Sequence, residues 1–95
     1  MDIQFELYKI FYHAAKHQNF TLAAQELFIT QSAVSQAIKN LEERLGCSLF
    51  YRQGRKMKLT WEGQLLFQDV EKAYLLIKSA ESKFQEINNL EMGEI

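Results

Sequence analysis

One group of side chains between residues 30 and 45 has types and a spacing that could do chemistry. On a helical wheel with about 100° per residue, Ile38, Leu41 and Leu45 fall within about 40° of Val34 and form a buried stripe. The opposite face is polar and lies between about 100° and 200°; it holds Ser32, Ser35, Gln36, Lys39 and Glu43, with Gln31 near its edge. The acid stands towards the C-terminal end, so the N-terminal part of this face offers only hydroxyl, amide and amino groups.

Such a face suits the major groove of B-form DNA, which admits a helix and presents donors and acceptors in a sequence-dependent pattern. Glutamine reads adenine well, while serine and lysine can reach bases or phosphates. Two helices joined by a tight turn, the second carrying this face, form a helix-turn-helix unit. Any surface helix has a polar face, so the pattern alone is equally consistent with an ordinary solvent-exposed helix that does not contact DNA.

A basic cluster follows this segment. The net charge is −1, but residues 1–60 carry eight Lys and Arg against five Asp and Glu, a net +3. Residues 61–95 carry three against seven, a net −4. The densest basic run is "RQGRKMK", which contains Arg52, Arg55, Lys56 and Lys58. Its Gly54 predicts a turn between the strand-like segments "SLFYR" and "KMKLT", and a basic hairpin can lay Arg55 along a minor groove.

His13 and His17 form a second candidate group, because an i, i+4 pair on a helix can chelate a metal. No cysteine or carboxylate is placed by the sequence to complete that site, since Glu6 lies two turns from His13. We therefore predict surface or packing histidines, no metal and no cofactor. Neither a nucleophile–base arrangement nor a phosphate-binding glycine loop is present, so we expect no enzyme. The single cysteine, Cys47, cannot form an internal disulfide and is interpreted as a small hydrophobe in a reducing cytoplasm.

The elements that must position these groups follow from apolar periodicity and from capping residues. We predict a helix over 3–17, a second over 22–28 with Thr21 as N-cap, and a third from the Thr30 cap to Leu45, where Gly46 stops it. Thr60 caps a long helix that runs to about residue 90. Gly63 is a cost that helix propensity does not explain. The predicted fold is mainly α, a winged helix-turn-helix of three helices plus a small β-hairpin in residues 1–60, followed by a long dimerisation helix in 61–95.

That last helix carries apolar residues at successive spacings of 4, 3, 4, 3, 4 and 3. They are Leu66, Val70, Ala73, Ile77, Ala80, Phe84 and Ile87. Such a seam needs a partner, either the surface of the first helix or a second copy of the chain. A helix of about 30 residues reaches roughly 45 Å, beyond a globule of about 60 residues, so we favour a homodimer through this seam.

The run "NFTLAAQELFITQSAVSQAIKNLEERLGCSLFYRQGRKMKLTWEG" resembles the N-terminal domain of LysR-type transcriptional regulators. That family shows "sFtxAAxxLxxsQ", then "AxSxxIxxLExxLGxxLFxR", then a wing that ends in "LTxxG". The likeness covers residues 3–63 without gaps, and a linker helix follows where the family has one. The specificity of these motifs makes sequence-specific binding of double-stranded DNA the expected function.

The resemblance implies roles for individual residues. Thr21 and Thr30 match helix-start positions near phosphates, and Arg52 and Arg55 match the arginine after "LF" and the wing arginine. The recognition-helix positions that approach bases or backbone are matched by Gln31, Ser32, Ser35 and Gln36. Lys39 is a candidate phosphate contact more from its place on the wheel than from the motif. Ser32 departs from the family, which usually has proline there, and this puts the base preference at that position in doubt.

The resemblance also implies partners. We expect an AT-rich, partly palindromic operator in the bacterial cytoplasm, close to the nucleoid, and a homodimer or, in the full-length protein, a tetramer. A small-molecule effector would bind only the effector-binding domain, which this sequence lacks, so the chain is expected to be truncated. No run of 18 apolar residues is present and no secretory signal is recognised, so no membrane partner is expected. A protein-interaction module, in which the winged fold and the seam bind another protein, is the alternative.

Overall fold

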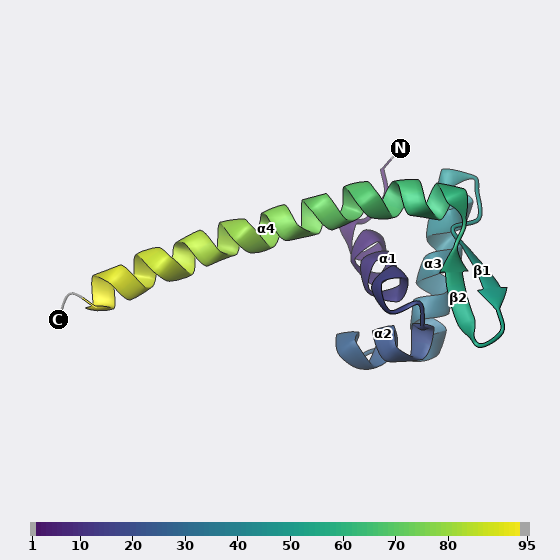
Figure 1. The fold of residues 1–95 in the computed structure, drawn as a ribbon, viewed down its shortest axis with the longest axis horizontal. Helices are drawn as coiled ribbons and strands as arrows, with labels where there is room; N and C mark the ends of the chain where they lie inside the picture. The colour runs from purple at the N-terminus through teal and green to yellow at the C-terminus, as the bar shows by residue number, and fades with distance from the viewer. Residues whose placement is uncertain (1, 94–95) are drawn as a thin grey trace.

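The computed structural model describes residues 2–93 of the 95-residue chain. Its elements are α1 (Phe5–His17), α2 (Phe20–Leu27), α3 (Gln31–Leu45), β1 (Phe50–Gln53), β2 (Lys56–Leu59) and α4 (Trp61–Gly93). Helices α1 to α3 pack together, the hairpin flanks α3, and α4 crosses this body and extends far beyond it (Figure 1). The molecule is therefore elongated, with principal extents of 55 × 28 × 20 Å. The winged helix-turn-helix with a long final helix is confirmed.

The core forms where α1 and α3 cross and where the hairpin closes over them. Phe11, Val34, Leu41 and Leu49 are its largest fully buried side chains. The predicted apolar stripe of α3 is confirmed, although its last member, Leu45, is only half-buried. Small residues let α2 approach closely, since Ala14, Ala23 and Ala24 are all buried. This packing leaves the opposite face of α3 in solvent.

Helix α2 begins earlier than the sequence patterns indicate. The prediction that Thr21 caps it is wrong, because Asn19 is the N-cap and its side-chain oxygen accepts a 2.9 Å hydrogen bond from the Leu22 amide. Asparagine caps at least as well as threonine. Phe20 is therefore the first residue of α2, and its ring packs edge-on against the Phe50 ring at 5.2 Å between centroids. Phe28 ends the helix in the left-handed region, at φ 58°.

Helix α3 has the predicted ends. The Thr30 hydroxyl oxygen accepts a 3.0 Å hydrogen bond from the Ala33 amide, and Gly46 closes the helix at φ 78°. Glu42, on the last turns of this helix, accepts hydrogen bonds from the Leu49 and Phe50 amides at 2.7 and 3.3 Å. The Glu42 carboxylate therefore holds the start of the hairpin against α3.

The hairpin is antiparallel, with Phe50 opposite Leu59 and Gln53 opposite Lys56. Its loop is shorter than predicted: Gln53 belongs to β1, which leaves only Gly54 and Arg55 between the strands. A two-residue loop with glycine first, here at φ 63°, is the type II′ pattern, whose twist matches that of the strands. The Met57 amide also donates to the Gln18 carbonyl at 3.1 Å, which ties the wing to the end of α1.

The structure explains Gly63, on the first turn of α4. A Cβ at this position would overlap the Leu49 carbonyl oxygen and would press on the Leu59 side chain. Close passage of α4 over the hairpin therefore requires glycine here. The Thr60 hydroxyl secures the same junction, because it accepts from the Gly63 amide at 3.0 Å and donates to the Ser48 carbonyl at 2.6 Å.

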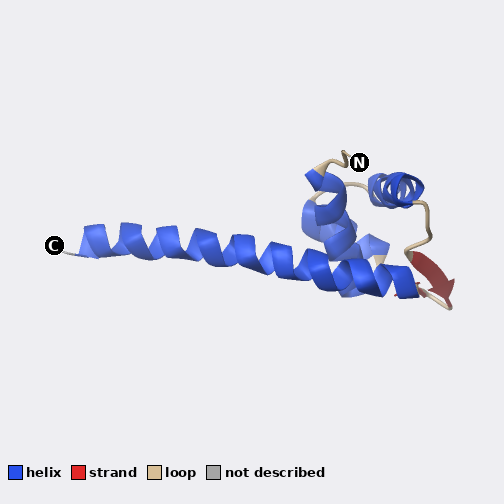
Figure 2. Ribbon diagram, turned by 90° about the horizontal axis from the view of Figure 1, so that it is seen from above, coloured by secondary structure: helices blue, strands red, loops and turns tan. Residues whose placement is uncertain are grey.

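The first half of α4 packs on α1 through aromatic rings. Tyr12 stacks on Tyr74 at 4.3 Å and on Phe67 at 5.8 Å between centroids. Beyond Tyr74 the residues of α4 up to position 90 are exposed, and the helix extends away from the body (Figure 2). Within residues 2–93, no helix combines the length and the apolar character that crossing a bilayer requires.

Candidate nucleic-acid interface

All nine residues predicted to contact DNA are solvent-exposed. Those on α3, together with its cap, lie opposite the buried stripe; they are Thr30, Gln31, Ser32, Ser35, Gln36 and Lys39. No charged residue occurs in the sequence between Glu26 and Lys39. The N-terminus of α3 therefore presents its partial positive charge and free amides with no neighbouring acid in sequence, an arrangement that favours phosphate.

Thr21 and Gln31 meet across the turn between α2 and α3. The Thr21 hydroxyl donates a 3.1 Å hydrogen bond to the Gln31 side-chain oxygen. Thr21 does not cap α2, and its hydrogen bond instead orients the side chain of Gln31, the first residue of α3. Both residues remain exposed, so the pair can still exchange this bond for contacts to a ligand.

Further along α3 the exposed face is slightly hollowed. The shallow groove is lined by Ala33, Gln36, Ala37, Lys39, Asn40 and Glu43. Asn40 accepts a 3.2 Å hydrogen bond from Arg44, whose guanidinium also donates to the Asp2 carbonyl at 3.1 Å. Arg44 is therefore used within the chain, and Lys39 is the exposed cation of this groove that makes no hydrogen bond or ion pair among the described residues.

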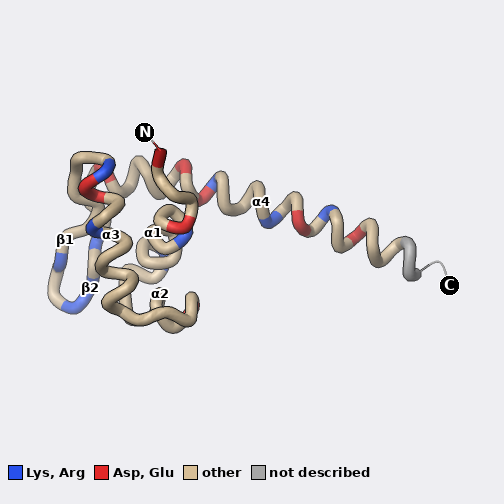
Figure 3. Tube along the Cα trace, turned by 180° about the vertical axis from the view of Figure 1, so that it is seen from behind, with Lys and Arg blue, Asp and Glu red and all other residues tan. Residues whose placement is uncertain are grey.

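The four basic residues of the wing are distributed over the two faces of the hairpin and its tip. Arg52 lies opposite Met57, on the strand face that it shares with Phe50. Lys56 and Lys58 lie on the other face, since side chains alternate along a strand. Arg55 occupies the two-residue tip, and Figure 3 shows the basic residues along both strands and at this tip. Figure 1 shows the tip and α2 at the same end of the domain, away from α4.

The predicted seam of α4 divides into two parts. Leu66 and Val70 are half-buried against the core of their own chain. From Ala73 onward the seam is exposed, with Ile77 44%, Phe84 67% and Ile87 49% accessible. An apolar groove between α1 and α4 continues this surface, lined by Phe5, Tyr8, Val70, Ala73, Tyr74 and Ile77 among others. The start of the seam therefore packs on the chain's own body, and its remainder from Ala73 to Ile87 is exposed.

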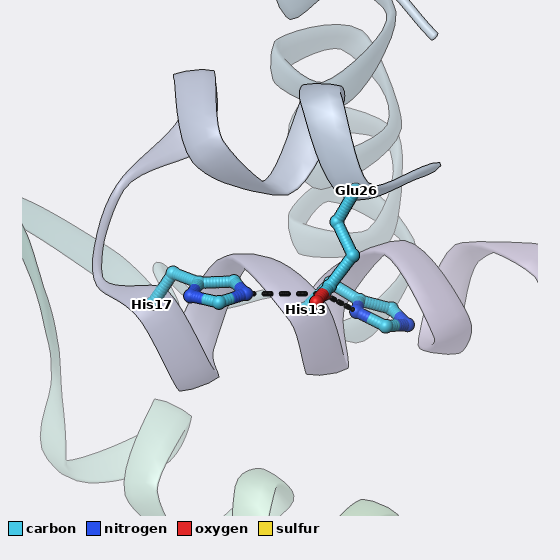
Figure 4. A group of neighbouring side chains, drawn as sticks. All are labelled: His13, His17 and Glu26. Atoms are coloured by element: carbon cyan, nitrogen blue, oxygen red, sulfur yellow. Dashed lines mark hydrogen bonds and ion pairs between the residues drawn. The ribbon is translucent and has the colours of Figure 1, made fainter. Parts of the chain in front are cut away.

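One group was missed from the sequence, at the junction of α1 and α2. Helix α2 brings Glu26 between the two histidines, where one carboxylate oxygen hydrogen-bonds His13 Nδ1 and lies 3.0 Å from His17 Nε2 (Figure 4). Hydrogen bonding to His13 first, and to His17 second, lowers the pKa of Glu26 below its usual value. The i, i+4 histidine spacing was a signal, but only the packing of α2 on α1 supplies the third group.

Comparison with known proteins decides the family. The family described as bacterial regulatory helix-turn-helix protein, lysR family, matches residues 5–64. The chain belongs to this family. The Escherichia coli K12 glycine cleavage system transcriptional activator is 47% identical over 77 residues, which are 81% of this chain and 25% of that protein. The chain thus spans about a quarter of the length of such relatives.

Solved structures of the family show the same fold. A BenM DNA-binding domain in complex with catB site 1 DNA is 33% identical, with a TM-score of 0.79 over 90% of this chain and 96% of that one. A probable transcriptional regulator from Pseudomonas aeruginosa is 30% identical, with a TM-score of 0.80 over 86% of this chain and 28% of that one. The likeness therefore includes the wing and most of α4, beyond the three helices.

Proposed function

We propose that this chain binds double-stranded DNA sequence-specifically as the DNA-binding domain of a LysR-type regulator. The observation that carries the proposal is the exposed N-terminal half of α3, which combines amide and hydroxyl side chains with an acid-free helix terminus. A helix with this face fits the major groove. The solved DNA complex of a related domain with the same fold supports the assignment.

Each exposed side chain has a role in this proposal. Gln31 and Gln36 read base edges, with Ser32 and Ser35 contacting bases or the adjacent backbone. Thr21, Thr30 and Lys39 contact phosphates, which fix the register of α3 in the groove. The wing then places Arg55 in the minor groove and Arg52 against the flanking backbone. Because Ser32 can donate a hydrogen bond where the family usually has proline, base preference there is specific to this chain.

We further propose that residues 1–60 read the DNA and that α4 pairs two chains into a homodimer. The length of α4 and its exposed apolar seam beyond Ala73 support this division. A dimer places two recognition helices on the half-sites of a partly palindromic operator, which is AT-rich where the wing enters a narrow minor groove. Transcriptional regulation in the bacterial cytoplasm, a tetramer and a response to a small-molecule effector belong to the same proposal and concern the full-length protein, because this chain spans about a quarter of the length of the transcriptional activator that it resembles.

The test is binding-site selection from random duplexes, followed by titration of the selected duplex and a scrambled one. We expect tighter binding to the selected duplex, and log affinity that falls linearly with log salt, with a slope of about −0.9 per phosphate neutralised. A protein-interaction module predicts neither result. Equal affinity for both duplexes at every salt concentration would refute sequence-specific binding.

A further inference from the structure

We propose that His13, His17 and Glu26 form a binding site for a divalent transition metal of the zinc class. One nitrogen or oxygen atom from each residue lies within 4.8 Å of the others. The group joins α1 to α2 and none of its members belongs to the proposed DNA-binding or dimer surfaces. Imidazole nitrogen and carboxylate oxygen are ligands that zinc takes in proteins.

The two helices pre-organise the three ligand atoms. His13 and His17 stand one turn apart on α1, so their rings project from the same face of the helix. Glu26 comes from α2, which packs on α1 and brings one carboxylate oxygen between the rings (Figure 4). An ion at this position would replace two imidazole–carboxylate hydrogen bonds by three coordinate bonds.

The surroundings of His13 select which of its nitrogens serves as ligand. Its ring lies edge-to-face with Tyr12 at 5.3 Å and with Tyr74 of α4 at 5.7 Å between centroids. Nε2 is buried without a hydrogen-bond partner among the described residues, whereas Nδ1 faces Glu26. The aromatic contacts therefore hold the ring with Nδ1 directed at Glu26.

Burial and charge at the site also suit a metal. The side chains of His17 and Glu26 are 27% and 38% accessible, so an ion can enter and can keep water in a remaining coordination position. The Glu26 carboxylate places one acidic group between the two imidazoles. Two imidazoles favour zinc, nickel or cobalt over magnesium, which prefers oxygen ligands.

Metal binding would clamp α1 to α2 and stabilise the folded domain. The test uses the 95-residue protein, free of any affinity tag and stripped with chelator. Calorimetry with Zn²⁺ should show one ion per chain, Co²⁺ should give visible absorption bands of a nitrogen- and oxygen-ligated site, and Mg²⁺ should give neither. Zinc at 100 times its Kd should raise Tm on the order of 10 °C.

Two variants and two matched controls assign the ligands. Loss of a group that merely supports a ligand costs about 10–100-fold in metal affinity, so His17→Gln and Glu26→Gln should each cost at least as much. Glu6→Gln, an exposed carboxylate on α1, and Cys47→Ser, the single thiol, should leave zinc affinity unchanged. Circular dichroism should show all four variants folded. Absence of zinc heat and cobalt bands, or unchanged affinity in either ligand variant, would overturn the site.

Discussion

The Thr21 hydroxyl donates a 3.1 Å hydrogen bond to the side-chain oxygen of Gln31, the first residue of α3. This bond joins the beginning of α2 to the beginning of the proposed recognition helix. Because the helix start is capped separately by Thr30, the Thr21 bond is not needed to form α3. Its consequence is instead to restrict the orientation of one exposed amide, which lowers the entropy lost when that amide contacts a base.

The variant Thr21→Val tests this relationship, because it keeps the side-chain shape and removes the donor. We expect weaker binding to the selected operator, because the variant removes both the bond to Gln31 and the proposed phosphate contact of Thr21, and an unchanged Tm, because both residues are exposed. Fluorescence anisotropy and thermal melting measure the two effects. Thr21→Ser, which keeps the hydroxyl, is the control. Operator affinity equal to wild type in Thr21→Val would show that the bond does not orient Gln31 for binding.

Gln36→Ala should mainly reduce discrimination between operators. A bidentate glutamine–adenine pair is worth about 1–3 kcal/mol against the wrong base, so the variant should lose preference at one position of the selected site. Competition titrations with single-base operator variants measure this loss. Gln68→Ala, an exposed glutamine on α4, is the matched control and should keep wild-type preference. Retained discrimination at every position in Gln36→Ala would remove Gln36 from base readout.

Arg55→Ala should weaken binding at the wing. Removing one protein cation from the DNA interface should reduce the salt slope by about 1. If the guanidinium lies in a narrow minor groove, the preference for AT-rich flanking sequence should fall as well. Titrations over a series of salt concentrations measure both changes, with Lys83→Ala on exposed α4 as the control for total charge. An unchanged slope would place Arg55 away from the DNA.

Local signals in the sequence predicted those elements whose ends depend on nearby residues. Thr30 and Gly46 bound α3 as expected, because a cap hydroxyl and a left-handed glycine act within one turn. The start of α2 was misplaced because Asn19 and Thr21 are both good caps. The choice between them depends on the contact of Phe20 with Phe50, which lies 30 residues further along the chain.

Groups assembled by tertiary packing could not be predicted in the same way. Periodicity showed that the α4 seam needs partners, but only the path of α4 over α1 shows where the chain's own core stops covering it. Glu26 has no sequence relationship to His13 and His17 that specifies contact. The crossing of α2 over α1 decides it, and that crossing depends on the buried Ala14, Ala23 and Ala24.

Gly63→Ala gives a stability test whose sign separates two explanations. Helix propensity alone predicts stabilisation by roughly 0.5–1 kcal/mol, because alanine replaces glycine inside a helix. Overlap of the new Cβ with the Leu49 carbonyl predicts a loss of about 1–3 kcal/mol instead. Urea denaturation at one fixed protein concentration measures the difference, and we expect the loss. Gln64→Ala, the next residue and exposed, should change the free energy of unfolding little.

Ile77→Asp tests the homodimer. Ile77 lies in the middle of the exposed seam and lines the apolar groove between α1 and α4. An aspartate there would place a charge in the apolar seam of a dimer, where burial without a partner is costly. The same charge costs little in a monomer, because the position is exposed in the isolated chain. Light scattering should therefore report monomers of unchanged helix content, and operator affinity should fall because the two half-sites are no longer linked.

The control for this variant is Ser79→Asp, two residues away on the same helix but off the seam. It introduces the same charge and should leave the dimer intact. A dimeric Ile77→Asp protein would locate the interface elsewhere, whereas monomers in both variants would mean that total charge, rather than the seam, controls association. Only dissociation confined to Ile77→Asp supports pairing through α4, because the two substitutions differ in the helix face that carries the charge.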